Sequence, residues 1–276
     1  QDLLKAGVIE FIDAEEEDGA LVCLYDKDLQ PEHTHLEIIP VAIMGLSASL
    51  LPFSQHNRGD RVNFGAKMIG QAVGVYATNY NLRSEAKSNI LVYPQTPLVE
   101  TALVKNSGMY THPAGQNVVI AVATHQGYNI NDAIVFNKAS VERGLFRSIF
   151  YKVHPTEQRR YWGGQEDAIK IPDKDVRGYK SEEDYASLNE DGIVAPETNM
   201  KDGGVLIGKV SPTRFLSSTE LMVGISNIRE SSVISGINGN VDRIFLTETL
   251  NGTRLVKAIV RDLRVPEVGD KFASRH

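Results

Sequence analysis

The sequence predicts a β-rich α+β fold, and three observations lead to it. Two unbroken apolar runs, residues 118–123 and 133–136, are bounded by turn-forming residues and resemble strands covered on both faces. An Asn-Gly pair at 251–252 separates two further strand-like segments, which is a strong hairpin signal. The spacing of apolar residues changes to that of a helix in the stretch that begins at Asn63. We therefore expect strands to dominate, with helices between them.

Length and composition indicate a globular chain of one or two domains. With 276 residues and 42% hydrophobic content, the chain has enough apolar surface for a core. Cys23 is the only cysteine, which excludes a disulfide framework and a cysteine zinc site and fits a reducing cytoplasm. No apolar run is long enough to span a bilayer, and no signal peptide opens the sequence. Because it starts at Gln1 and stops at His276 after a dense polar motif, we expect a piece of a longer protein.

The negative charge is concentrated near the N-terminus. The net charge is -6, but residues 1–40 contain eleven acidic residues and two lysines, whereas the rest contains 24 acidic and 27 basic residues. Local sign matters more than the total when the partner is a polyanion. The charge distribution therefore permits a nucleic-acid surface beyond residue 40 without requiring one.

The first 40 residues are expected to form small elements. We predict a short helix or strand at 3–11, a solvated acidic loop at 13–18 and a strand at 20–25. His33, His35 and Glu37 have the alternate spacing that places side chains on one face of a strand, as metal ligands can be. No further cysteine or histidine cluster lies nearby to complete a ligand set, so we expect no metal there.

The helix predicted from Asn63 follows a candidate phosphate contact. If Asn63 is the N-cap, Arg61 stands at the helix N-terminus, where unpaired N–H groups and the helix dipole favour a phosphate. Gln71 lies four residues from Lys67, on the same side of the helix. A surface arginine before a helix usually has no such role, so this arrangement alone is weak evidence. The apolar face is expected to consist of Phe64, Met68, Ala72 and Val75.

The chain is organised around the polar stretch between its two apolar runs. Gly127, Asn129 and Asn131 are residues that tolerate a tight reversal. The reversal delivers Asp132 at the mouth of a rigid β-scaffold, where a carboxylate has no packing role. The local pattern by itself favours a turn carboxylate that hydrogen-bonds its own backbone over a functional acid.

The composition shifts at about Ser148, after a short helix that we expect to be capped by Ser140 and to end at Gly144. Residues 148–263 are interpreted as a separate β-rich subdomain. Within it we predict strands at 205–210, 241–249 and 254–261, and a mobile loop at 213–235.

The last residues form a dense polar motif. Asp270, Lys271, Arg275 and His276 lie within seven residues, directly after a glycine. Two or three cations in such a place can clamp phosphates. An exposed C-terminal tail is the alternative interpretation.

Several stretches together resemble one protein family. They read Ala-Ser-Leu-Leu-Pro-Phe at 48–53, Gln-Ala-Val-Gly at 71–74, Tyr-Pro-Gln-Thr-Pro-Leu at 93–98, Pro-Ala-Gly-Gln-Asn at 113–117, Gly-Tyr-Asn-Ile-Asn-Asp at 127–132, Glu-Arg-Gly-Leu-Phe-Arg-Ser at 142–148, and Gly-Asp-Lys-Phe-Ala-Ser-Arg-His at 269–276. In this order they resemble the second-largest subunit of multisubunit DNA-directed RNA polymerases, of the archaeal and eukaryotic type. The resemblance covers essentially the whole chain, and the last motif is very specific.

The resemblance implies a domain organisation. Residues 1–45 would be the end of an external domain. Residues 46–147 and 264–276 would belong to the hybrid-binding region, which contains a double-psi β-barrel. Residues 148–263 would be the wall, called the flap in bacterial enzymes. The boundary between these two regions at residue 148 agrees with the composition shift near Ser148.

The resemblance also implies a metal-directed role for one acidic residue. Members of this family extend RNA by two-metal nucleotidyl transfer, with a catalytic aspartate triplet on the largest subunit; no Asp-Phe-Asp-Gly-Asp motif occurs in this sequence. Asp132 matches the second acid of a pair near the nucleotide-borne Mg²⁺, which it would contact directly or through water. The first acid, a glutamate in the family, is Asn131 here, so one formal charge is missing beside the metal.

Further matched positions are directed at substrate and nucleic acid. Arg61 matches an arginine that contacts the incoming nucleoside triphosphate, and Lys271 matches a lysine near the RNA 3′ end. With Asp132, they form the expected catalytic set, since cations stabilise charge on the leaving pyrophosphate. Gln71 would line the RNA–DNA hybrid, and Arg275 would bind nucleic acid.

The implied partners follow from the family. They are the largest polymerase subunit, with which Mg²⁺ would be shared, the other polymerase subunits, the DNA template, the RNA–DNA hybrid and nucleoside triphosphates. We expect no zinc in this chain and no membrane contact, and a cytoplasmic location, or a nuclear one in a eukaryote. The chain alone is expected to be inactive.

Two alternatives belong to other functional classes. The chain could be a scaffold or docking module without chemistry of its own, as the absent triplet and Asn131 suggest. It could also be part of a polymerase-like paralogue with a weakened metal site.

Overall fold

The computed structural model describes residues 1–40, 44–162, 164–213 and 228–274. The described chain divides into two compact units, which are treated separately below. The first unit comprises residues 1–71, 98–110 and the C-terminal residues from 272. The second unit comprises residues 72–97 and 111–271.

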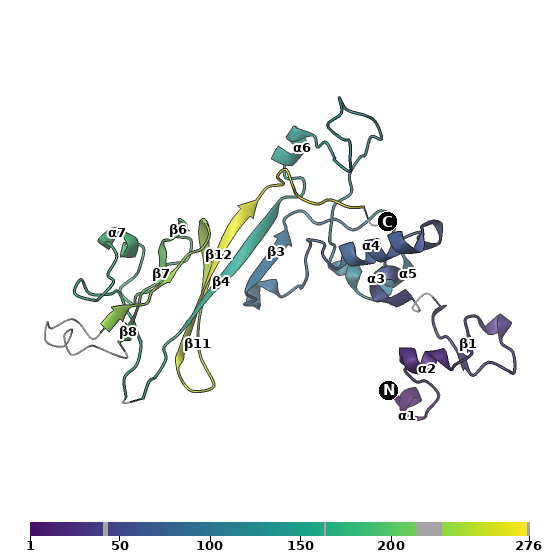
Figure 1. The fold of residues 1–276 in the computed structure, drawn as a ribbon, viewed down its shortest axis with the longest axis horizontal. Coiled ribbons are helices and arrows are strands. Elements are labelled where there is room, and N and C mark those ends of the chain that lie inside the picture. Colours follow the sequence, from purple (N-terminus) through teal and green to yellow (C-terminus); the bar gives the residue numbers. More distant parts are fainter. Residues whose placement is uncertain (41–43, 163, 214–227, 275–276) are drawn as a thin grey trace. The chain divides into compact units, whose positions relative to one another are not determined.

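Apart from α4, the helices of the described chain are short, and the longest strands, β4, β11 and β12, belong to one sheet (Figure 1). The helices are α1 (Asp2–Lys5), α2 (Ala14–Asp18), α3 (Gly45–Ser49), α4 (Gly59–Ile69), α5 (Ala102–Asn106), α6 (Lys138–Glu142) and α7 (Glu182–Tyr185). The strands are β1 (Val22–Cys23), β2 (His35–Leu36), β3 (Lys87–Leu91), β4 (Ser148–Glu157), β5 (Ala168–Ile169), β6 (Asn199–Met200), β7 (Val205–Ile207), β8 (Lys209–Pro212), β9 (Ile228–Glu230), β10 (Val233–Ile234), β11 (Gly239–Glu248) and β12 (Arg254–Arg264). The prediction of a β-rich fold is confirmed.

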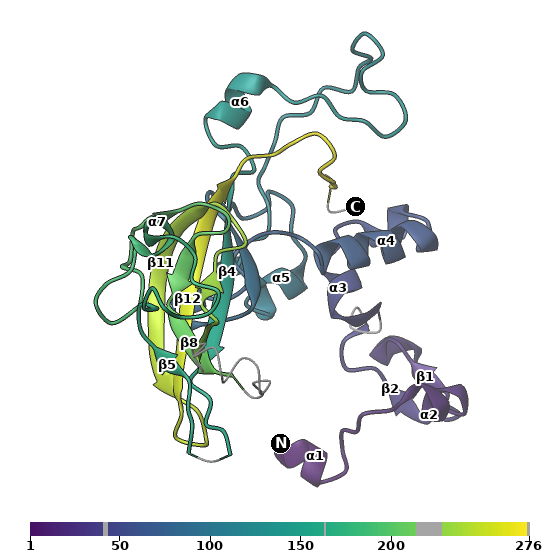
Figure 2. The same ribbon diagram turned by 60° about the vertical axis from the view of Figure 1, so that its left-hand side comes forward.

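The second unit is built on an antiparallel sheet with the strand order β3-β4-β12-β11-β6, visible in both ribbon views (Figures 1 and 2). The predicted Asn251-Gly252 hairpin is confirmed: β11 and β12 pair antiparallel up to Glu248 and Arg254. Gly252 has φ +69° in the connecting turn, a conformation that glycine adopts at no steric cost. β3 lies at one edge of this sheet.

The main hydrophobic core covers one face of this sheet. In an antiparallel ladder, paired residues share a face and alternate residues point the same way. Val256, Ala258 and Val260 of β12 and Val241 of β11 therefore point together, and all four are fully buried. Facing them is a second set from the following segments: Ile193, Val194, Met200, Leu206 and Ile207. This core makes the sheet a rigid base for the loops at its ends.

The opposite face carries a smaller apolar cluster. Ile90, Tyr151 and Ile259 come from three adjacent strands, β3, β4 and β12, and pack with the partly buried Tyr80. Tyr80 and Tyr151 approach with ring centroids 6.5 Å apart, a favourable aromatic distance. The second unit is therefore packed on both faces of its sheet.

A buried ion pair ties the turn after β4 to β8. Asp167 is fully buried, and its carboxylate lies 2.7 Å from the Lys209 ammonium, which also donates to the Glu157 carbonyl. The Tyr161 hydroxyl donates to the same carboxylate at 3.0 Å. Burial raises the pKa of Asp167, but hydrogen bonds from Lys209, Ser211 and Tyr161 outweigh it, so the net pKa is lowered. A charged pair at this depth is stable only because these bonds are made.

In the first unit, α4 packs against the segment that follows α3. Gly65 is the buried residue of α4, and a Cβ placed there would lie 3.0 Å from Leu51. The Thr101 hydroxyl donates to the Ser49 carbonyl, which joins α5 to this pair of helices. Phe64 is exposed, so the predicted apolar face was wrong: Gly65, not Phe64, faces the neighbouring segment.

The largest difference from the sequence-based expectations concerns the two apolar runs. Residues 118–123 and 133–136 form no strand within the described chain, and most of their side chains are exposed: Val119 and Val122 are 103% and 99% exposed. A strand requires a neighbouring backbone about 4.8 Å away to pair its N–H and C=O groups. No described segment lies beside these runs in a ladder. The two runs are apolar, but apolar side chains alone do not supply the neighbouring strand with which a backbone must pair.

Helix boundaries account for the other corrections. α4 begins at Gly59 with Arg58 as its N-cap, not at Asn63, so Arg61 lies within its first turn. α6 is capped by Asn137, whose side chain accepts from the Ser140 N–H; Ser140 is therefore inside the helix. The acidic run was expected to be a loop, but Asp13 caps it into the exposed helix α2.

The remaining predictions for the second unit have mixed outcomes. The strand predicted at 205–210 is present as β7 and β8, divided at Gly208. Part of the loop predicted at 213–235 forms β9 and β10; residues 214–227 of that loop lie outside the described residues. The short helix or strand predicted at 3–11 is helical only over α1, and the strand predicted at 20–25 shortens to β1.

Candidate functional site

Three connecting segments leave the five-stranded sheet at the same end. Leu91, the last residue of β3, pairs with Ser148, the first residue of β4, and Ser148 also pairs with Arg264, the last residue of β12. The chain after Leu91, the chain before Ser148 and the chain after Arg264 therefore meet at one edge of a rigid sheet. Asp132 belongs to the second of these segments and Lys271 to the third, so both loops start from the same end of the sheet.

Asp132 is carried by residues 118–143, which extend beyond the start of β4 and include α6 (Figure 1). Two tight turns shape this 118–143 segment. In each turn both central residues have positive φ: Gln126 and Gly127 in the first, Asn131 and Asp132 in the second. The turns are closed by hydrogen bonds from Tyr128 N to His125 O (2.9 Å) and from Ala133 N to Ile130 O (3.4 Å). Positive φ at both central positions is the signature of type I′ turns, for which Asn, Asp and Gly are preferred.

Asn129, between the two turns, bonds through its side chain to the backbone at and before the first turn. Its Oδ1 accepts from His125 N at 2.9 Å, and its Nδ2 donates to Ala123 O at 2.6 Å. Asn129, rather than Asp132, therefore supplies the side-chain bond to the local backbone that the sequence suggested for a turn carboxylate. Within the described residues no hydrogen bond or ion pair engages the Asp132 carboxylate, which is exposed. The acid is held in place by its backbone and is available to a ligand.

Lys271 follows a turn that an ion pair fixes. Arg264 donates to the Asp270 carboxylate, which also accepts from the Glu267 N–H at 3.0 Å. The Arg264 guanidinium, and then the Glu267 N–H, lower the pKa of Asp270. Asp270 is thus engaged in its own turn, whereas Lys271 is exposed at the end of that turn. Arg275 lies outside the described residues.

Arg61 and Gln71 belong to the first unit and lie near opposite ends of α4. Arg61 is in the first turn, with its guanidinium 5.7 Å from the centre of the Phe64 ring. The N-cap residue Arg58 makes no side-chain cap, which leaves first-turn N–H groups for another acceptor. Gln71 comes two residues after the helix ends and is exposed, so the predicted helical pairing with Lys67 was wrong. Within the described chain, Asp132 and Lys271 share the second unit, while Arg61 and Gln71 share the first.

The sequence reasoning gave no role to a set of amide side chains at the sheet end. Gln116 Nε2 donates to Tyr93 O at 2.8 Å, and Gln116 Oε1 accepts from Phe146 N at 2.9 Å. Gln95 Oε1 accepts from Asn117 N at 2.9 Å. These bonds interlock residues 93–97, 113–117 and 144–147, which we call the root of the 118–143 segment. The signal was present, because these residues fall in motifs that carry the family resemblance.

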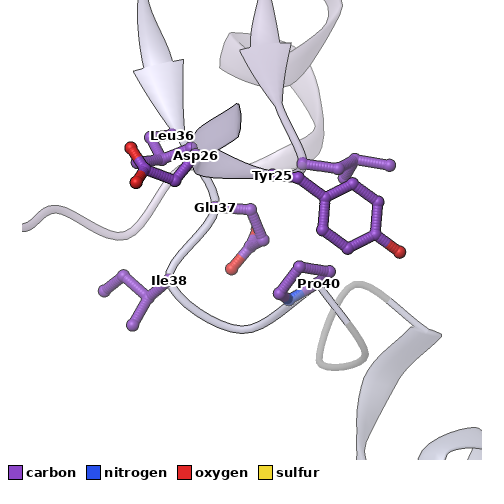
Figure 3. Close-up of a pocket in the computed structure, with 7 residues that line it drawn as sticks. Tyr25, Asp26, Leu36, Glu37, Ile38 and Pro40 are labelled. Carbon is purple, nitrogen blue, oxygen red and sulfur yellow. The ribbon is translucent and has the colours of Figure 1, made fainter. Parts of the chain in front are cut away.

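The His-x-His-x-Glu pattern does not assemble a metal site in the described chain. His33 Nδ1 accepts from the Gln30 N–H, and His35 pairs with Glu10. Glu37 instead lines a pocket of about 300 Å³ beside β1 and β2, together with Tyr25 (Figure 3). Across the described residues no three His, Cys, Asp or Glu side chains gather as metal ligands do. None of the described helices has the length and apolar character needed to cross a membrane.

Comparisons with known proteins match the chain along almost its whole length. Residues 47–276 match the family described as RNA polymerase Rpb2, domain 6, and residues 1–40 match RNA polymerase Rpb2, domain 5. DNA-directed RNA polymerase subunit Rpo2 of Sulfolobus acidocaldarius and that of Saccharolobus solfataricus are each 48% identical over 100% of this chain. DNA-directed RNA polymerase II subunit RPB2 of Schizosaccharomyces pombe is 33% identical over 99% of it. The chain spans 25% of the length of each of these relatives.

Proposed function

We propose that this chain, which belongs to the family of second-largest subunits of DNA-directed RNA polymerases, contributes side chains to RNA synthesis inside an assembled polymerase. The reaction is template-dependent nucleotidyl transfer, in which the RNA 3′ hydroxyl attacks the α-phosphate of a nucleoside triphosphate and pyrophosphate leaves. The catalytic aspartate triplet belongs to the largest subunit. This chain contacts the nucleotide, the RNA end and the hybrid.

The observation that carries the proposal is the presentation of Asp132. Asn131 and Asp132, both with positive φ, form the turn. That backbone conformation costs energy and persists only where the surrounding structure imposes it. The carboxylate at the turn is exposed and takes part in no bond within the described chain. An acid held in place by its backbone, with free oxygens, is suited to bind a ligand from a partner subunit or a substrate.

The oxygen atoms of Asp132 and Asn131 fit a Mg²⁺ ion that is shared with the largest subunit. They are too few to form a complete metal site in this chain. Mg²⁺ prefers oxygen ligands, keeps several waters and is often held by one or two carboxylates together with substrate phosphates. Asp132 offers one such carboxylate, and Asn131 offers a neutral amide oxygen. When bound, the ion neutralises charge on the triphosphate and on the leaving pyrophosphate. Asp132 orients that ion by direct contact or through a water.

The cations act on the phosphates of the substrate. Arg61 combines a guanidinium with the first turn of α4, and both favour a phosphate oxygen. Lys271 is an exposed ammonium at the end of a fixed turn, suited to a phosphate near the RNA 3′ end. Each stabilises negative charge that grows as the pyrophosphate leaves. Gln71 and Arg275 contribute to holding the hybrid through backbone contacts, which makes that binding independent of sequence and sensitive to salt.

The proposal extends to the domain organisation. Residues 46–147 and 264–276 form part of the hybrid-binding region with its double-psi β-barrel, and residues 148–263 form the wall. The exposed apolar runs at 118–123 and 133–136 support this, because they have the composition of barrel strands. The strands β4, β12, β11 and β6 of the five-stranded sheet support it as the rigid part of the wall, and β3 joins them from the hybrid-binding region.

Nucleotide addition by a reconstituted polymerase tests the proposal. We expect Asp132→Ala and Lys271→Ala to reduce the rate at limiting nucleotide by about tenfold or more, because each removes a charge aimed at the transition state. Assembly of the polymerase, measured by gel filtration, should remain intact because both side chains are exposed. Wild-type elongation rates in both variants would refute the proposed roles.

A second candidate is a scaffold without chemistry of its own, which the neutral Asn131 and the lack of a metal-ligand cluster in the described residues favour. Asn131→Glu distinguishes the two. If the turn faces the nucleotide-borne ion, the added carboxylate lowers the Mg²⁺ concentration needed for half-maximal rate, despite a strain of about 1 kcal/mol for glutamate at positive φ. Asn131→Gly is the matched control, because it keeps the turn and adds no oxygen. An unchanged Mg²⁺ requirement in both variants favours the scaffold.

A further inference from the structure

Three sequence motifs without an assigned role meet at the root of the 118–143 segment. Tyr93 and Gln95 come from the chain after β3, Gln116 and Asn117 from the turn before the segment, and Phe146 from the chain before β4. The side-chain bonds of Gln116 reach both neighbours: Nε2 donates to Tyr93 O at 2.8 Å, and Oε1 accepts from Phe146 N at 2.9 Å. One amide thereby fixes three backbone segments.

The backbone at this root is held in conformations that need support. Phe146 has φ +52°, a backbone conformation that residues other than glycine adopt at a cost in free energy. The Phe146 N–H donates to Gln116 Oε1, so this hydrogen bond stabilises that conformation directly. Gly144 has φ +115°, and a Cβ there would lie 2.6 Å from the Tyr93 ring. This close contact between the Tyr93 ring and the backbone at Gly144 restricts the backbone conformation where the segment leaves the root.

A ring contact continues from the root toward Asp132. Phe146 and Phe136 pack edge to face, with ring centroids 6.0 Å apart and planes at 89°. This is a favoured aromatic geometry. Phe136 is four residues after Asp132 on the same backbone, directly after the second apolar run. The bond at Phe146 N, the ring contact and the turn therefore form a continuous path from Gln116 to the carboxylate.

The root bonds and the contact between the Phe136 and Phe146 rings join the segment to the rest of the second unit. Residues 118–136 form no ladder with any described strand, and their valines and isoleucines are largely exposed. Where an element lacks a packed face, its position depends on its ends. The direction in which Asp132 points is therefore sensitive to the geometry of the root.

We propose that Gln116 is a positioning residue for nucleotide addition, which acts through Phe146 and Phe136 to hold the Asp132 turn in its productive place. This inference rests on the proposed function of Asp132. Gln116 itself contacts neither substrate nor metal. Its loss displaces a correctly folded carboxylate rather than removing it, and a displacement of about 1 Å at a reacting group can cost about 100-fold in rate.

The test is a double-mutant cycle in a polymerase reconstituted with the full-length second subunit. The variants are Gln116→Met, Asp132→Asn and the two combined. Methionine matches glutamine in length but neither donates nor accepts these bonds, and asparagine keeps the turn at 132 without the charge. The readouts are the rate of single-nucleotide addition and the Mg²⁺ concentration for half-maximal rate. Gln158→Met, at the far end of β4, is the matched control because Gln158 is also half-buried and makes none of the root's bonds.

We expect Gln116→Met to lower the rate about tenfold and to raise the Mg²⁺ requirement, with Gln158→Met unchanged. The combined variant should be no slower than Asp132→Asn, because Gln116 acts only through that carboxylate. Hydrogen exchange of residues 118–143 in the assembled enzyme should be faster in Gln116→Met. Multiplicative losses in the combined variant, or a wild-type Gln116→Met, would overturn the inference and leave the role of Asp132 standing. A wild-type Asp132→Asn would instead refute the proposed function itself, and the inference with it.

Gln116→Glu keeps the test decisive if the methionine variant does not assemble. It preserves an oxygen that accepts from Phe146 N, and it replaces the donor to Tyr93 O by a carboxylate oxygen that the carbonyl repels. Since the path to Asp132 runs through Phe146, we expect Gln116→Glu to stay closer to the wild-type rate and Mg²⁺ requirement than Asp132→Asn does. Equal defects in these two variants would contradict that path.

Discussion

Valine has opposite environments in two parts of the second unit. Val241, Val256 and Val260 are fully buried in the five-stranded sheet, whereas Val119 and Val122 of the 118–143 segment are almost entirely exposed. Both groups occur in apolar stretches that predict strands. The difference is the partner: β11 and β12 pair with each other through a tight hairpin, while residues 118–123 have no described strand beside them. The apolar pattern therefore gives the tendency to be buried, and pairing decides whether burial occurs.

The comparison also separates stability from function. The five-stranded sheet carries the buried core, the smaller sheet β5-β8-β9 carries the buried ion pair, and the segments at the end of the five-stranded sheet carry the exposed acid and cation of the candidate site. Rigid elements that carry loops with functional residues are a common arrangement. The following variants test whether the two regions are energetically as different as their burial suggests.

The largest effect is expected at the buried ion pair. Lys209→Met leaves the Asp167 carboxylate buried without its cation, which should destabilise the second unit by about 3–5 kcal/mol. Urea unfolding of the 276-residue chain measures the change. Lys174→Met is the matched control: Lys174 forms an exposed pair with Glu182, so its loss should leave the urea midpoint unchanged. Equal midpoints for the two variants would contradict the separation of the regions.

The apolar residues themselves provide the next test. Leu206→Ala removes a fully buried side chain from the core and should cost about 2–5 kcal/mol through lost burial and the cavity that remains. Val122→Ala changes a side chain that is already exposed, and its effect should stay within about 0.5 kcal/mol. Both changes are followed by urea unfolding of the same chain. A large loss of stability in Val122→Ala would show that the 118–143 segment is packed in solution.

The sequence was sufficient for elements whose partners are local. The hairpin at Asn251-Gly252 was predictable because turn chemistry and strand register are encoded within about twenty neighbouring residues. The predicted helix caps, Asn63 and Ser140, were wrong. Arg58 caps α4 without a side-chain bond, and Asn137 caps α6 three residues before Ser140. Several side chains can cap at such positions, and tertiary contacts choose among them.

The residues of the candidate site, Asp132, Arg61 and Lys271, stay predictions that rest on the family resemblance. Their local geometry could not be predicted from the sequence. The two consecutive turns, and the bonds of Asn129 to the backbone at the first of them, depend on backbone angles that no residue pattern specifies uniquely. Gln116 was missed as a positioning residue because its partners, Tyr93 and Phe146, are 23 and 30 residues away along the chain.

A smaller and pH-dependent effect is expected in the sheet. His154 is buried on β4, and its Nε2 has no hydrogen-bond partner in the described chain. Burial, and then the nearby Lys152, lower the pKa of His154 below its ordinary value of 6.5. In the unfolded chain the imidazole protonates as the pH falls through about 6.5, whereas in the folded chain it remains neutral until a lower pH. Stability is therefore full above pH 6.5 and declines below it, by at most about 1.4 kcal/mol per pH unit for one proton.

Unfolding in urea between pH 7 and pH 5 measures this slope. His154→Leu should reduce it, because the variant has no group to protonate at that position. The same slope in the variant and the wild type would assign the acid sensitivity to other residues.

The central claim is that the charge of Asp132, and not merely its turn, serves nucleotide addition. Asp132→Asn tests this most directly, because asparagine tolerates positive φ and keeps the turn while it removes the carboxylate. The measurement is the rate of single-nucleotide addition at limiting nucleotide by a reconstituted polymerase carrying this one change. We predict a loss of at least about tenfold, or about 1.4 kcal/mol in the barrier, that added Mg²⁺ partly restores. A wild-type rate at every Mg²⁺ concentration would contradict the account.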